Sequence, residues 1–269
     1  MDNILLAIRE FIASCDNYSE DIDIAVIDAD SFSGNQLKTF IKRLAKDMAA
    51  DLEELVVPNV TSKGSRFYKA IYQYPNLVGL TSSAVKAGRI LIEVNTYANP
   101  YPYTNQDVSS FLTEYLLTIG RIDLIEQYDL KPFSINVLDK RRTIVEKLVS
   151  LFRFSFEANS VKSLSSKIRH FYDLYYLIND DKCSNYIQSA DFRYDFQELF
   201  IHDQQQFSEP DGWCTKTIKD SPLLKDFSGI WLKLSPNYRK ELTPLAFSEI
   251  SNEVLIGKCF MRILKELSI

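Results

Sequence analysis

The spacing of apolar residues changes along this 269-residue chain, and the change limits the folds that it can adopt. The first half contains short apolar runs that are typical of strands, at 18–26, 66–74, 89–95 and 133–137. From Lys140 onward, apolar residues recur at intervals of three and four, which predicts amphipathic helices. We therefore expect an α+β fold with two domains, one over residues 1–138 and a helical one over residues 139–269.

Three further elements are expected in the first domain. Residues 3–13 and 36–55 carry apolar side chains at helical spacing, so both segments are predicted to be helices. A third helix is expected to begin near Gln106, after a stiff proline-containing loop.

Composition narrows the class of protein. With 46% hydrophobic residues the chain can bury a sizeable core, and its short, charge-interrupted apolar runs are below the roughly 20 residues that span a bilayer. No basic segment followed by an apolar one stands at the N-terminus, so we expect a cytoplasmic protein without a membrane partner. The four cysteines are widely spaced and form no metal-binding pattern, which favours free thiols.

Two carboxylates alternate in the first predicted strand. Because side chains two positions apart on a strand share a face, Asp21 and Asp23 are expected to project together. Such a pair can bind a hard cation such as Mg²⁺, which takes oxygen ligands and leaves positions for water and substrate phosphates. The alternative is that these residues form a solvated polar edge with no ligand.

Glu93 is unusual because it interrupts the apolar strand at 89–95. A carboxylate among Ile90, Leu91, Ile92 and Val94 has to be paired with a cation or bound to a metal to offset the cost of burial.

Basic residues are concentrated over residues 140–169, although the net charge of the whole chain is −5. The overall charge argues against a general nucleic-acid-binding protein, but this stretch can face phosphate locally. It can equally be the solvated side of ordinary helices.

Five motifs occur in order along the chain: Tyr-Ser-Glu-Asp-Ile-Asp-Ile (18–24), Ile-Leu-Ile-Glu-Val (90–94), Pro-Tyr-Pro (100–102), Arg-Thr-Ile-Val-Glu-Lys-Leu (142–148) and Arg-His-Phe-Tyr-Asp-Leu-Tyr (169–175). In this order they resemble the AbiEii/AbiGii-type nucleotidyltransferase toxins of type IV toxin-antitoxin systems. The resemblance implies a DNA polymerase β-like nucleotidyltransferase fold with a helical C-terminal part and Mg²⁺ dependence. It also implies transfer of a nucleotide from NTP to an acceptor, in some members tRNA, and an antitoxin encoded by a neighbouring gene.

The resemblance also assigns roles to individual residues. Asp21 and Asp23 match the paired metal ligands, and Glu93 matches a further acidic residue at the metal. Ser19 and Lys147 match nucleotide-binding positions, with Lys147 contacting the triphosphate, and Asp173 matches a late aspartate required for activity. Without these roles, Lys147 would be a surface residue paired with its neighbours, and Asp173 would accept a hydrogen bond from Arg169. His170 is expected to pack or to form hydrogen bonds rather than to act as a base.

One part of the family's pattern is absent. A Gly-Gly-Thr or Gly-Gly-Ser loop normally precedes the acidic pair, whereas this interval holds Ile4, Leu5, Leu6 and Ala7. Glycine lets the backbone approach the triphosphate closely, so its absence predicts either a start at an internal methionine or a loss of catalysis. In the second case the chain would be a non-catalytic protein that uses the basic stretch to bind RNA or a protein partner.

Overall fold

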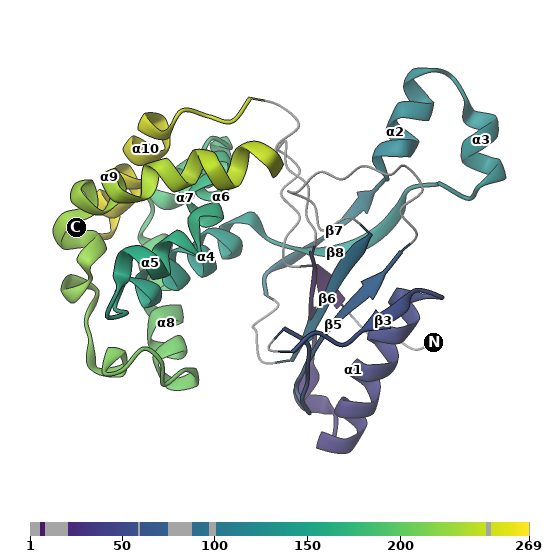
Figure 1. Ribbon diagram of the computed structural model, residues 1–269, viewed down its shortest axis with the longest axis horizontal. Coiled ribbons are helices and arrows are strands. Elements are labelled where there is room, and N and C mark those ends of the chain that lie inside the picture. The colour runs from purple at the N-terminus through teal and green to yellow at the C-terminus, as the bar shows by residue number, and fades with distance from the viewer. Residues whose placement is uncertain are drawn as a thin grey trace. The chain divides into compact units, whose positions relative to one another are not determined.

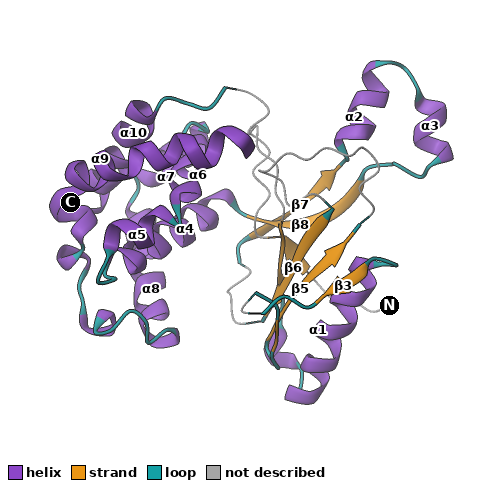
Figure 2. Ribbon diagram, in the orientation of Figure 1, coloured by secondary structure: helices purple, strands orange, loops and turns teal. Residues whose placement is uncertain are grey.

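The computed structural model describes residues 6–8, 21–58, 60–74, 88–96, 101–245 and 249–268. Contacts within the chain define two compact units. We call the described residues 6–8 and 21–139 the sheet unit, and those from Lys140 onward the helical unit. Figures 1 and 2 show the sheet of the first and the packed helices of the second.

The sheet unit is built on one mixed sheet, in which the described residues form eight strands. The strands are β1 (Leu6–Ile8), β2 (Asp21–Val26), β3 (Glu53–Leu55), β4 (Ser62–Lys63), β5 (Phe67–Gln73), β6 (Arg89–Asn95), β7 (Tyr103–Val108) and β8 (Phe133–Leu138). Their order is β3-β5-β6-β2-β1-β8-β7, and β4 pairs with β5 outside this path. The pairs β2/β6 and β1/β8 are parallel, and the other pairs are antiparallel.

Helix α1 (Gly34–Ala49) covers one face of the sheet. It begins with a capping box, in which Ser33 and Gln36 satisfy each other's backbone N–H groups. Its buried residues pack with the alternate apolar side chains of the central strands, which include Ile24, Ile92 and Ala70. Because alternate strand residues point to opposite faces, the odd-numbered residues of β2, β5 and β6 lie on the other face.

A helical hairpin is inserted between β7 and β8. It consists of α2 (Phe111–Thr118) and α3 (Ile122–Gln127), which Figure 1 shows beyond the ends of these two strands. Thr113 ties α2 to the chain leaving α3, since its hydroxyl donates to the Leu130 carbonyl over 2.7 Å.

The helical unit contains one large apolar core. Its α-helices are α4 (Lys140–Ser155), α5 (Ser160–Ser165), α6 (Ile168–Ile178), α7 (Asp181–Ile187), α8 (Ala190–Gln206), α9 (Pro222–Leu242) and α10 (Glu253–Leu267). Three short 3₁₀ helices join them, at Trp213–Thr215, Ile218–Asp220 and Thr243–Leu245. Aromatic rings dominate this core; the Phe171 and Phe260 rings, for example, meet edge to face with centroids 4.7 Å apart. Among the described residues, no helix combines the length and hydropathy needed to cross a membrane.

The structure confirms an α+β protein with a mainly helical C-terminal part, but it corrects three predicted elements. Leu6–Ile8, in the predicted helix over 3–13, is a strand held between β2 and β8, and the rest of that prediction lies outside the described residues. The helix predicted over 36–55 ends at Ala49, because Glu53–Leu55 pairs with β5. The helix expected near Gln106 is instead the edge strand β7, and α2 begins at Phe111.

The described cysteines, Cys183, Cys214 and Cys259, are free thiols, as the sequence predicts. Cys15 lies outside the described residues.

Candidate functional site

Three predicted site residues lie on the sheet face opposite α1. Asp21 and Asp23 alternate along β2 with Ile22 and Ile24, which pack toward α1. Strand β6 runs parallel to β2, and Asp23 is directly in register with Glu93. The sheet therefore brings Asp21, Asp23 and Glu93 to one face, each of them partly buried.

The next residue across this face is a lysine. Lys69 on β5 is in register with Glu93, and its Nζ forms an ion pair and hydrogen bond with Glu93 Oε1. We call Lys69, Glu93 and Asp23 the charged row, because they lie side by side on three adjacent strands. The sequence predicts that Glu93 is either paired with a cation or bound to a metal, and Lys69 is such a cation.

The donor set on this face suits a hard cation in part. Asp21 and Asp23 offer carboxylate oxygens from one face, and Mg²⁺ is commonly held by one or two protein carboxylates together with substrate phosphates. Glu93 faces Lys69. Within the part of the chain that the structure describes, no group of three or more Asp, Glu, His or Cys side chains forms a potential metal centre. The residues therefore fit a cation held by two carboxylates and phosphate, and a third ligand from Glu93 stays a prediction.

The other two predicted site residues meet inside the helical unit. Lys147 on α4 and Asp173 on α6 form an ion pair of 2.8 Å between Nζ and Oδ2. Only 4% of the Lys147 side chain and 11% of the Asp173 side chain are exposed. This burial excludes the alternative that Lys147 is an ordinary surface residue.

The pair is buried because both helices are covered on most sides. Helix α4 buries Ile144, Leu148 and Leu151, and α6 buries Phe171 and Leu174 in the same core. Polar groups in such surroundings are tolerated only when they are paired and hydrogen-bonded, so each residue offsets the cost of burying the other.

His170 lies three residues before Asp173 on α6. Burial, reinforced by the positive charges of Lys147, Lys167 and Arg169, holds its pKa well below the usual 6.5. Its Nδ1 is buried, and no described group forms a hydrogen bond with it. His170 is therefore neutral at pH 7, and a role in packing agrees with the prediction from sequence.

Each unit thus contains its own part of the predicted site. The sheet unit holds Asp21, Asp23 and Glu93, and the helical unit holds the Lys147–Asp173 pair. Ser19 lies outside the described residues. The residue that sequence reasoning missed is Lys69; its signal in the sequence is that it is the single charged residue of the strand Phe67–Gln73.

A mixed sheet that carries two carboxylates on one face and a helix on the other can hold a cation with phosphate groups, which is the chemistry of phosphoryl- and nucleotidyl-transferases. Comparison with protein families agrees with this class: residues 17–250 match the family described as nucleotidyl transferase AbiEii toxin, type IV TA system. The chain belongs to this family. No curated protein matches it in sequence.

Proposed function

We propose that this protein is a Mg²⁺-dependent nucleotidyltransferase that moves a nucleotide from an NTP to an acceptor. The observation that carries the proposal is the placing of Asp21, Asp23 and Glu93 on one sheet face, in a chain of the AbiEii family.

Each residue has a distinct proposed role at this face. Asp21 and Asp23 hold Mg²⁺, which when bound neutralises phosphate charge and lowers the pKa of an attacking hydroxyl. Glu93, fixed by Lys69, orients the acceptor hydroxyl or a ligand of the cation. Lys147 neutralises charge on the triphosphate, and Asp173 fixes the position of its Nζ.

The proposal extends to the domain bounds, the fold type of the first domain, the acceptor and the antitoxin. We assign residues 1–138 to a transferase domain of the DNA polymerase β-like type and residues 139–269 to a helical domain. The mixed sheet, with α1 on one face and carboxylates on the other, supports this assignment. The acceptor is RNA, with tRNA as the first candidate, and an antitoxin is expected from a neighbouring gene.

The test is incorporation of labelled NTP into tRNA by the full chain in the presence of Mg²⁺. We expect Asp23→Asn to lower the rate at least about a hundredfold, since the substitution removes a charged ligand of the cation. Asp107→Asn is the matched control, because Asp107 is another strand carboxylate of the same sheet and accepts a hydrogen bond from Ser134. Equal incorporation by Asp23→Asn and the unmodified chain would contradict the proposed metal site.

A second candidate function is favoured by the basic residues concentrated over 140–169, among them Lys162, Lys167 and Arg169. It is binding of RNA without catalysis. Salt-sensitive RNA binding with no incorporation in any condition would support it, and measurable incorporation would exclude it.

A further inference from the structure

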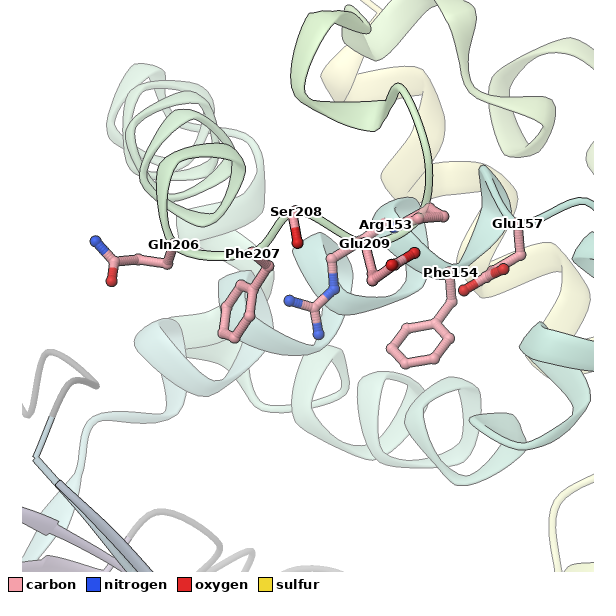
Figure 3. A pocket seen from close by; sticks show the side chains of 8 residues that line it. Arg153, Phe154, Glu157, Gln206, Phe207, Ser208 and Glu209 are labelled. Atoms are coloured by element: carbon pink, nitrogen blue, oxygen red, sulfur yellow. The ribbon is translucent and has the colours of Figure 1, made fainter. Parts of the chain in front are cut away.

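A cavity of about 270 Å³ in the helical unit is formed where α4 ends and where the chain leaves α8 (Figure 3). It is lined by Arg153, Phe154, Glu157, Gln206, Phe207, Ser208, Glu209 and Pro210. Its volume is near the lower end of the ~300–1,000 Å³ that small-ligand sites occupy, so it suits one ring system. None of these residues belongs to the site described above.

Planar side chains line this cavity. The Arg153 guanidinium lies over the Phe207 ring, with 4.1 Å between its carbon and the ring centroid, and 5.4 Å from the centroid of Phe154. Figure 3 shows it between the two rings. Asp203 holds the guanidinium through an ion pair of 3.8 Å. Guanidinium planes and aromatic rings are the surfaces on which proteins stack unpaired nucleobases.

The cavity also offers groups that can contact the edge of a base. Gln206 has both a donor and an acceptor, Ser208 has a hydroxyl, and Glu157 and Glu209 accept from N–H groups. Base edges present N–H donors and carbonyl or ring-nitrogen acceptors, so this mixture matches them.

Cations for phosphate lie close by. Lys167 places its Nζ 4.8 Å from the centroid of Phe154, which lines the cavity. Beside it in the chain, Arg169 helps to line a second cavity of about 580 Å³, together with Lys162, Ser165 and Asn237. Glu241 also lines this second cavity, so its charged residues are two cations and one carboxylate. A stacking surface with cations nearby for the phosphates is the general design of single-strand binding sites.

We propose that the first cavity binds one unpaired nucleobase of a single-stranded RNA, whose phosphates lie along Lys167, Lys162 and Arg169. This inference rests on the proposed function in that the RNA is the acceptor. Binding does not need catalysis, so the two can be tested separately.

The experiment measures binding of a labelled single-stranded RNA to the full chain by fluorescence anisotropy, without NTP or Mg²⁺. We expect Phe207→Ala to weaken binding by about five- to hundredfold, the range found when one base loses its aromatic partner. Phe207→Tyr keeps the ring and should restore the affinity, which separates stacking from misfolding. Tyr194→Ala is the control, since Tyr194 is an aromatic residue of α8 that is 66% exposed and lies outside the cavity. Unchanged affinity in Phe207→Ala would overturn the proposal.

Two further measurements, of salt dependence and of competition by a nucleotide, identify the ligand. Lys167→Gln should lower the slope of log affinity against log salt by about 0.7, the value for one phosphate contact on a single strand, whereas Lys182→Gln on α7 should leave the slope unchanged. A nucleoside monophosphate should compete weakly, and competition equal to that of the RNA would assign the cavity to a free nucleotide and overturn the strand proposal. RNA binding that needs Phe207 in a chain without transfer activity would reject the proposed function and keep this inference.

Discussion

The two units each pair a lysine with a carboxylate, but in different surroundings. In the sheet unit the side chains of Lys69 and Glu93 are 27% and 22% exposed, whereas in the helical unit those of Lys147 and Asp173 are 4% and 11% exposed. Water screens the first pair and can replace either partner, and it does so much less for the second. The first pair can therefore exchange partners when a ligand arrives, whereas the second is part of the fold of its unit.

Removing one partner of the buried pair should have the largest effect on stability. We expect Asp173→Ala to lower the free energy of unfolding of the helical unit by about 3–5 kcal/mol, because it leaves the Lys147 charge buried without its carboxylate. Both tryptophans, Trp213 and Trp231, belong to this unit, so their fluorescence in a denaturant titration reports its unfolding. A decrease in the free energy of unfolding below about 1 kcal/mol would show that the pair does not stabilise the helical unit.

Replacing both partners separates stability from activity. We expect the double variant Lys147→Met, Asp173→Leu to recover most of the stability lost in Asp173→Ala, since apolar residues of similar volume often replace a buried ion pair without loss. The same protein should show no nucleotide transfer if Lys147 acts on the triphosphate. Transfer at the rate of the unmodified chain would reduce the pair to a structural role.

The neutral His170 should make the stability of the helical unit depend on pH. Its folded pKa is well below the 6.5 of the unfolded chain, so the unfolded state binds more protons as pH falls below about 6.5. Stability should therefore be complete above pH 6.5 and should decrease below it, by at most about 1.4 kcal/mol per pH unit. Tryptophan-detected unfolding between pH 5 and 7 measures this slope, and His170→Gln should flatten it. Equal slopes in the two proteins would contradict the assignment.

Breaking the exposed pair should have the smallest effect on stability. We expect Glu93→Gln to cost no more than about 1 kcal/mol, because both partners are partly solvated. Amide hydrogen exchange of β5 and β6 measures this change in the sheet unit. The same substitution should lower transfer, and a cost of several kcal/mol would remove the contrast between the two pairs.

Strands with a long apolar run could be predicted from the sequence, whereas the polar edge strand β7 and the three-residue strand β1 could not. The predicted strand over 89–95 is β6, residue for residue, because its apolar run reflects burial on both faces. Strand β7 is polar, and its residues from Thr104 to Asp107 are exposed, so no apolar pattern marks it. Leu6–Ile8 has only three residues in a strand, and its pairing with β2 and β8 outweighs a helical spacing of apolar side chains.

The positions of the candidate site residues could likewise be predicted only where they depend on local spacing. The alternation of Asp21 and Asp23 with apolar residues was sufficient to place both carboxylates on one face of a strand, since that depends only on the local period of two. The family motifs pointed to Glu93, Lys147 and Asp173 without showing what each of them contacts.

By itself, the sequence determined the α+β class, the strands β2, β5, β6 and β8, the helical second half and the family, because these depend on local periodicity and on motifs along the chain. Only the tertiary structure decided that Lys69 neutralises Glu93 and that Lys147 is buried against Asp173. The first pair depends on the register of β5 with β6, and the second on how α4 packs against α6. Partners 24 and 26 residues apart are brought together by long-range packing, which no local pattern encodes.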